Sequence, residues 1–264
     1  MIIAEHHIEY KYGDIIKIKP IFDVHMGNRH CDVRGFKKFL QDDDDPQTYF
    51  IGGGDLLDSI VVTDKRYRKT EDGTTGDDIV DEQIAEMLEC LLPYKGRILG
   101  LGTGNHEDVI TKRCGTNPIK RLCKELDVPF LGYSCFFRIR MSEKGGRGRQ
   151  VVIKQHHGWG GGSRTRGANI TKYERDLGKW DADVFLYGHV HQKQYDRMPR
   201  LGISGMKLVS RPQLMAICGT FLKTLSDTSD PTYSELKGFP PTEIGGITIK
   251  IKPTPQSYDL WAEG

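Results

Sequence analysis

The sequence has few of the features that mark membrane, secreted or disulfide-stabilised proteins. Its 264 residues contain no apolar run approaching the ~20 residues that a membrane-spanning helix needs. Residues 1–7 lack the basic region, apolar stretch and small-residue cleavage site of a secretory signal. The six cysteines are scattered without CxxC spacing, which favours free thiols in a reducing compartment. We therefore expect a soluble, cytoplasmic protein without disulfides.

A linker, an internal repeat and a strong net charge are also missing. Without a Pro/Ser-rich linker, and with 37% hydrophobic residues available for a core, residues 1–264 are expected to form a single domain. A net charge of +2 is too small to indicate a nucleic-acid-binding protein, so any such function must come from local patches. Basic residues gather in 65–69, 138–149 and 164–175. These stretches are either solvated loops or part of a substrate track.

Apolar runs with strand-like composition alternate with amphipathic segments in the first two thirds of the chain. Strands are predicted over 15–22, 48–51, 97–101, 131–141, 151–155 and 183–187, followed by shorter antiparallel strands over 193–197, 206–209, 214–218 and 247–251. Helices are predicted over 32–41, 79–92 and 117–126, and from an N-cap at Asn169 to about 177. Residues 61–78 are expected to form an excursion or lid, and 224–246 an ordered surface loop.

Polar residues of metal-binding type follow the predicted strands. They are Asp23 and His25, Asp55 and Asp58, Asn105 and His106, the pair His156 and His157, and His189 and His191. In strand geometry, Asp23 and His25 share a face, and Asp58 would join Asp55 if a helix began there. Taken singly, each motif is also typical of a turn or of a structural histidine. The four aspartates at 42–45 precede a proline, which favours a hydrated loop over a metal site.

In order, the motifs are D-x-H, G-D-x-x-D, G-N-H-E, a His-Gly after a strand, and G-H-x-H. This series resembles the calcineurin-like metallophosphoesterase superfamily and spans Asp23 to His191. The loop 157–166 and the tail 218–246 are similar to phage-encoded members. The resemblance implies a four-layer α/β fold, in which a central β-sandwich of two mixed sheets is flanked by helices. It also implies two metal ions at the strand ends.

The resemblance further implies roles for individual residues. The first metal would be bound by Asp23, His25 and His191, the second by Asn105, His157 and His189, and Asp55 would bridge them. His156 is the alternative to His157, although strand alternation would point the two side chains in opposite directions. His106 would lie near the leaving group, oriented by Asp58.

Two cations ~3.5–4 Å apart can bind phosphate oxygens and lower the pKa of a bridging water, which supplies a hydroxide for in-line attack. Because the ligands combine imidazole with hard oxygen, Mn, Fe, Zn or Ni fit better than Mg or Ca, and Mn is the first expectation. His106, kept cationic by a nearby carboxylate, would protonate or stabilise the leaving oxygen. Arg164 and Arg166, in the loop after His157, would hold a flanking phosphate of the substrate. The alternative is that both arginines are solvated.

Three functions compete at this stage. The first is a phosphodiesterase or nuclease that acts on DNA or nucleotides, because basic segments flank the expected site. The second is a phosphomonoesterase for small phosphorylated molecules, and the third a metal-bound scaffold without catalysis. A complete ligand set argues against the scaffold. A protein phosphatase is not expected, since Ser59 and Ile60 stand where the protein phosphatases of this superfamily carry Arg-Gly.

Overall fold

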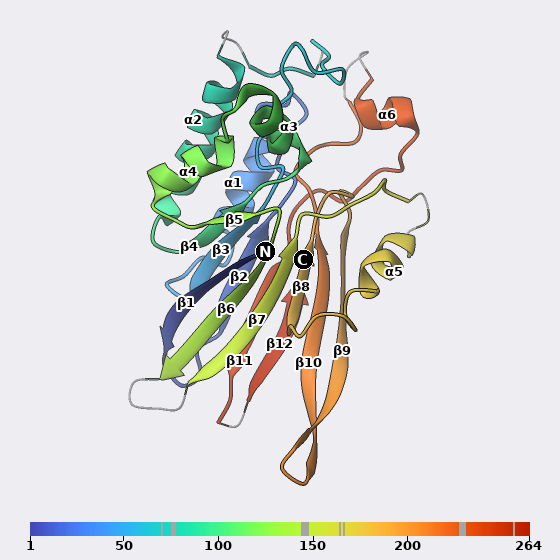
Figure 1. The fold of residues 1–264 in the computed structure, drawn as a ribbon. Helices are drawn as coiled ribbons and strands as arrows, with labels where there is room; N and C mark the ends of the chain where they lie inside the picture. Colours follow the sequence, from blue (N-terminus) through green and yellow to red (C-terminus); the bar gives the residue numbers. More distant parts are fainter. Residues whose placement is uncertain are drawn as a thin grey trace.

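Two six-stranded mixed sheets pack face to face at the centre of the protein (Figure 1). The computed structural model describes residues 1–69, 71–74, 78–143, 148–163, 165, 167–226, 231–255 and 257–264. The first sheet has the order β1 (Ile2–Tyr10), β6 (Ser134–Glu143), β7 (Arg149–His156), β8 (Val184–Tyr187), β10 (Lys207–Cys218), β9 (Lys193–Ser204). The second has the order β12 (Tyr258–Glu263), β11 (Thr248–Pro253), β2 (Ile16–Ile21), β3 (Thr48–Gly53), β4 (Ile98–Gly102), β5 (Phe130–Gly132). The predicted fold class is confirmed.

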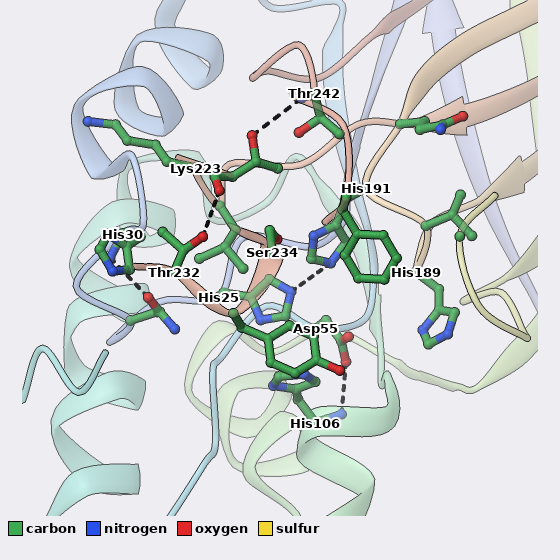
Figure 2. Close-up of a pocket in the computed structure, with 18 of the residues that line it drawn as sticks. His25, His30, Asp55, His106, His189, His191, Lys223, Thr232, Ser234 and Thr242 are labelled. Carbon is green, nitrogen blue, oxygen red and sulfur yellow. Dashed lines mark hydrogen bonds between the residues drawn. The ribbon is translucent and has the colours of Figure 1, made fainter. Parts of the chain in front are cut away.

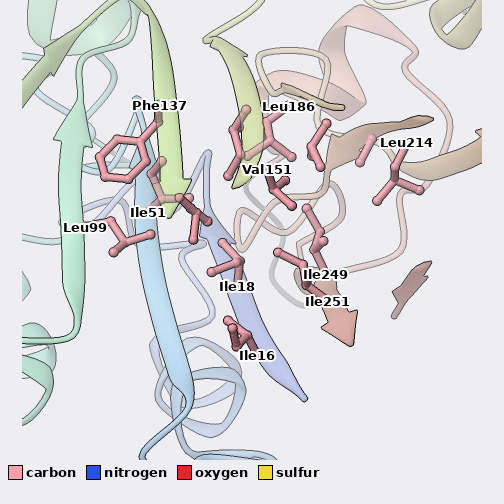
Figure 3. Close-up of a cluster of buried hydrophobic side chains, with 14 of the residues drawn as sticks. Ile16, Ile18, Ile51, Leu99, Phe137, Val151, Leu186, Leu214, Ile249 and Ile251 are labelled. Atoms are coloured by element: carbon pink, nitrogen blue, oxygen red, sulfur yellow. The ribbon is translucent and has the colours of Figure 1, made fainter. Parts of the chain in front are cut away.

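The hydrophobic core lies between the two sheets. Ile18 and Ile51 from the second sheet meet Phe137, Val151 and Leu186 from the first (Figure 3). Along β6, buried and more exposed side chains alternate, as expected for a strand with one face on the core. Every residue of β2 is buried, because its outer face is covered as well. Its sequence still alternates, with isoleucines toward the core, and the buried Lys17 and Lys19 ammonium groups donate to the Asp43 and Asp45 carboxylates and to the Phe39 carbonyl.

Helices cover the outer faces of the sandwich. On the second sheet lie α1 (Val33–Gln41), α2 (Ile79–Leu91), the 3-10 turn η1 (Leu92–Tyr94), α3 (Asn105–Cys114) and α4 (Pro118–Leu126). Their apolar side chains, among them Phe36 and Leu122, pack against Phe50 and Leu101 of the sheet. On the first sheet, Tyr173 of α5 (Ala168–Glu174) packs against Tyr187. Within the described residues, no helix combines the length and the apolar character that crossing a membrane requires.

The structure differs from the sequence-based prediction at several elements. It adds β1, β12 and α3, and it places a short helix, α6 (Tyr233–Lys237), inside the predicted loop 224–246. The two predicted strands at 206–209 and 214–218 form one long strand, β10, paired with β9 along its length. Asn169 does not cap α5, whose N-cap is Gly167. The Asn169 side chain is buried instead, and its Oδ1 accepts a hydrogen bond from the Ser163 backbone at 3.2 Å.

Candidate metal centre

The predicted ligands gather at one edge of the sandwich, just beyond the carboxyl ends of five strands. Asp23 and His25 follow β2, Asp55 follows β3, and Asn105 begins α3 shortly after β4. In the first sheet, His157 directly follows β7, and His189 and His191 follow β8. The strands β2, β3 and β4 are parallel to one another, and so are β7 and β8. The carboxyl ends of each set therefore lie side by side at one edge of the sheet. Both sheets therefore contribute side chains to one site.

The backbone at the site adopts a conformation that strand alternation does not provide. Left-handed φ angles of 48°, 54°, 50°, 71° and 54° occur at Asp23, His25, Asp55, His189 and His191. Such angles are uncommon for residues other than glycine and carry a free-energy cost. Asp23 and His25 do lie close together, but the predicted reason, that they share a face of a strand, is wrong. Both lie beyond the strand, and the left-handed backbone turns their side chains inward.

The first donor group consists of Asp23, His25 and His191. The His25 Nε2 and His191 Nε2 atoms lie 3.1 Å apart, and Asp23 Oδ1 is 3.7 Å from His191 Nε2. Asp23 Oδ2 accepts a hydrogen bond from the His189 backbone at 2.7 Å, while buried Oδ1 accepts none from any described residue. Two ring nitrogens that face each other beside a carboxylate oxygen without a hydrogen bond are well suited to share a cation.

The second donor group consists of Asp55, Asn105, His157 and His189. The His157 Nδ1 donates to the Gly53 carbonyl at 3.2 Å, which turns Nε2 toward Asp55 Oδ2 at 3.2 Å and Asn105 Oδ1 at 3.1 Å. Asn105 Oδ1 also lies 2.7 Å from His189 Nδ1. A backbone carbonyl that holds the far ring nitrogen is the usual way in which proteins orient a metal-binding histidine.

Asp55 lies between the two groups. Its ligand atom falls within 4.8 Å of those of His157 and His189 on one side, and within 4.8 Å of those of His25 and His106 on the other. The ligand atoms of Asp23, His25 and His191 also lie within 4.8 Å of one another. The structure therefore brings together all seven residues predicted as metal ligands, with Asp55 between the two donor groups.

Buried charge at the site supports a cationic ligand. Burial raises the pKa of Asp23 to about 7 and that of Glu107 to about 7. Burial would also lower the pKa of His157, but the carboxylates of Asp55 and Asp23 outweigh it and raise that pKa to about 9. Buried carboxylates this close to one another are costly unless positive charge compensates them. The donor atoms and their charge therefore fit a pair of divalent cations.

Of the paired histidines, His157 lies at the donor groups and His156 does not. His157 is fully buried between Asp55 and Asn105. His156 has its ring 5.0 Å from that of Trp159, and its Nδ1 accepts a hydrogen bond from the Gly158 backbone at 2.9 Å. His156 is thus engaged outside the donor groups, and its burial lowers its pKa to about 4.

The structure corrects the predicted relation between His106 and Asp58. No helix starts at Asp55, and Leu57 instead bridges to Met26. The His106 Nδ1 donates to the backbone carbonyl of Asp58 at 2.6 Å, whereas the Asp58 carboxylate is 3.7 Å from it and 3.3 Å from His25 Nδ1. Burial lowers the pKa of His106 more than nearby carboxylates raise it. The expectation that a carboxylate keeps this ring cationic is therefore wrong for the protein alone.

Glu107 is a positioning residue that the sequence analysis left without a role. Its buried carboxylate accepts hydrogen bonds from the backbone of Gly104 at 2.8 Å, Asp55 at 3.1 Å and Leu57 at 3.0 Å, so it fixes the loop that carries Asp55. In the sequence, its place directly after Asn105 and His106 could have indicated a role at the site. Gly104 matters for a different reason, since a Cβ there would lie 2.1 Å from Asp55 Oδ1. Only glycine permits that approach.

A cavity of about 290 Å³ opens above the donor groups (Figure 2). His25, Asp55, His106, His189 and His191 line it. Its other walls include residues 160–163, 222–224, 232–234, 239–240 and Thr242, together with Ile60, Arg66 and Glu71. The Lys172 ammonium holds the first of these segments by donating to the carbonyls of Trp159 and Gly161, each at 3.1 Å. Arg164 and Arg166 lie outside the described residues, so their predicted role stays a prediction.

No protein-family model and no curated protein matches the sequence. Three solved structures show a weak likeness. A predicted phosphoesterase from Streptococcus pneumoniae has 13% identity and a TM-score of 0.32, covering 95% of this chain and 99% of that one. Vps29 from Entamoeba histolytica, solved with zinc, has 14% identity and a TM-score of 0.34, covering 94% and 98%. A metallophosphoesterase from Sphaerobacter thermophilus has 12% identity and a TM-score of 0.37, covering 94% and 89%.

Two of these three proteins are described as phosphoesterases, the class that the sequence motifs resemble. None of the three comparisons bears on the resemblance to phage-encoded members, which stays a prediction.

Proposed function

We propose that the protein is a phosphoesterase that depends on two divalent metal ions. The observation that carries this proposal is the pair of donor groups joined by Asp55, with the buried Asp23 Oδ1 atom accepting no hydrogen bond from the described residues. When bound, the two cations would polarise the phosphate ester and lower the pKa of the attacking water. A structural metal site would be closed on all sides, whereas these groups face a cavity that can admit a substrate.

The residues of the chain set the conditions for this chemistry. Burial lowers the pKa of His189 and His191, which favours the neutral imidazole that binds a metal ion. Asp55 supplies a negative charge between two positive ones, and Asn105 adds a neutral oxygen. This mixture of nitrogen and oxygen donors favours Mn, Fe, Zn or Ni over Mg and Ca. Mn is our first choice.

We propose further that the substrate is a phosphodiester of a nucleotide or of DNA, and that the enzyme works in the cytoplasm. Among the described residues that line the cavity, the lysine and arginine side chains are Lys223 and Arg66. Arg66 is already paired with Asp64 at 3.0 Å, and Glu71 adds a negative charge to the same wall. This modest positive charge suits the single charge of a diester better than the double charge of a monoester.

The proposal is tested by hydrolysis of bis-p-nitrophenyl phosphate and p-nitrophenyl phosphate, followed by single- and double-stranded DNA. We expect exhaustive chelation to abolish activity and added Mn to restore it, with a higher kcat/KM for the diester. Activity that survives chelation would contradict the metal dependence. A higher kcat/KM for the monoester would support the alternative, a phosphatase for small phosphorylated molecules.

A separate prediction concerns Arg164 and Arg166. If they hold a flanking phosphate, replacing both by alanine should raise KM for an oligonucleotide far more than KM for bis-p-nitrophenyl phosphate. The salt dependence of oligonucleotide binding should also weaken, because fewer phosphate contacts remain. Arg175→Ala is the matched control, since Arg175 is exposed at the end of α5 and is not among the described cavity residues. Equal effects on both substrates would leave the two arginines only a supporting role.

A further inference from the structure

The segment that carries α6 forms a wall of the cavity and is held by hydrogen bonds. At its start, Thr232 Oγ1 accepts from the Glu235 backbone at 3.1 Å, and the Glu235 carboxylate accepts from the Thr232 backbone at 2.6 Å. At its end, Gly238 has a φ of 63°, its N–H donates to the Glu235 carbonyl, and the next N–H, that of Phe239, donates to the Ser234 carbonyl, each at 3.0 Å. Both ends of this five-residue helix are therefore capped.

Further hydrogen bonds fix the segment to the rest of the protein. Thr232 Oγ1 donates to the Thr224 carbonyl at 2.6 Å, and the Thr242 backbone donates to Thr224 Oγ1 at 3.3 Å (Figure 2). On the other side, Arg68 Nη1 donates to the Pro231 carbonyl at 3.1 Å, which joins the segment to the 61–74 excursion. The wall is thus held on both sides of the helix.

These hydrogen bonds do not position side chains of the hydrophobic core, because none of the residues of α6 is buried. They place two aromatic rings instead. Tyr233 at the start of the helix and Phe239 just beyond its end both line the cavity, and they are 47% and 37% exposed. Leu222 and Pro240 extend the same wall. Large aromatic side chains fixed with much of their surface open to a cavity are suited to bind a planar group.

We infer that Tyr233 and Phe239 form a stacking subsite for the nucleoside arm of a phosphodiester, an assignment that rests on the proposed function. The metal donor groups line another side of the same cavity. A single substrate molecule could therefore place its phosphate at the metals and its base on the aromatic wall. The cavity volume of about 290 Å³ suits one nucleoside unit rather than a length of chain. Because every base can stack on an aromatic ring, the subsite would favour a nucleoside without distinguishing one base from another.

Two diesters with the same leaving group test this inference. One is the p-nitrophenyl ester of thymidine 5′-phosphate, and the other is methyl p-nitrophenyl phosphate. We expect the wild type to prefer the thymidine ester. Tyr233→Ala and Phe239→Ala should each lower its kcat/KM by roughly 5- to 100-fold, the range for losing one stacked base, and leave the methyl ester unaffected. Tyr233→Phe should retain the preference. Leu236→Ala is the matched control, because Leu236 is 59% exposed on the same helix and is not among the described cavity residues.

The outcomes separate this inference from the proposed function. Hydrolysis of the methyl ester without a preference for the thymidine ester, or equal losses on both esters, overturns the stacking subsite and leaves the phosphoesterase intact. If the wild type hydrolyses neither ester with any of the four metals, the proposed function fails. Calorimetry with thymidine alone then decides on the subsite. Binding that is lost in Tyr233→Ala and Phe239→Ala supports it, and an absence of binding to the wild type overturns it.

Discussion

Asp55→Asn is expected to lower kcat for phosphate esters by about 10³-fold, because metal ions contribute several kcal/mol of transition-state stabilisation and this residue lies between the two donor groups. The substitution keeps the size of the side chain but removes its negative charge. It also turns one oxygen into an NH₂ group, which cannot bind a cation. His157 Nε2, 3.2 Å from Asp55 Oδ2, would lose its anionic partner. Metal content measured by atomic emission should fall in parallel with kcat.

Asp42→Asn is the matched control for this experiment. Asp42 is an exposed aspartate in the 42–45 run, which precedes the start of β3, whereas Asp55 follows the end of that strand. The same chemical change there should leave both metal content and kcat unchanged. A thermal melt of each variant separates loss of function from loss of fold. Near-wild-type kcat in Asp55→Asn would remove the bridging residue from the mechanism, and with it the two-metal proposal.

The strands that position the donor residues could be predicted because their sequences are mostly apolar, as in β4 and β8, or alternate between isoleucine and lysine, as in β2. The run from Ile16 to Ile21 is buried throughout, and β4 and β8 are also buried along their whole length. The missed elements have weaker patterns. In β1 the alternation is real, but most of the inward-facing residues are only partly buried, and the strand carries His6 and His7. Helix α3 begins with Asn-His-Glu-Asp, and its buried residues are Glu107 and Ile110, which is too little apolar surface to mark a helix.

At the site, the identity of the donor residues was visible in the sequence, but their geometry was not. The left-handed backbone at Asp23, His25 and Asp55 depends on contacts made after folding. For example, the Asp23 carbonyl accepts a hydrogen bond at 2.7 Å from Thr220 Oγ1, which is 197 residues away in the sequence. The aromatic wall was hidden for the same reason. Nothing in the composition of residues 224–246 shows that Tyr233 and Phe239 come to lie beside the donor groups.

His106→Asn is expected to lower kcat by roughly 10²–10⁴-fold while the metal content stays at two ions, as for the loss of a general acid. The Nδ1 atom of this ring donates to the Asp58 carbonyl at 2.6 Å, so Nε2 remains for the substrate. Nε2 can give up a proton only when the ring is doubly protonated, a state that the negative charge of a bound phosphate would favour. The leaving group gives a sharper readout than kcat alone. A p-nitrophenolate leaves without a proton, whereas an alkoxide requires one, so the loss should be larger for an alkyl-leaving diester than for bis-p-nitrophenyl phosphate.

Asp58→Asn serves as the companion variant for His106. Because the contact of His106 is with the Asp58 backbone carbonyl, the substitution preserves it and removes only a carboxylate that is 3.7 Å from His106 and 3.3 Å from His25. We therefore expect a loss in the same direction but smaller. The ligand atoms of His25, Asp55 and His106 also lie within 4.8 Å of one another, which makes metal binding by His106 the alternative role. Loss of one ion in His106→Asn, with equal effects on aryl and alkyl leaving groups, would establish that role in place of the acid.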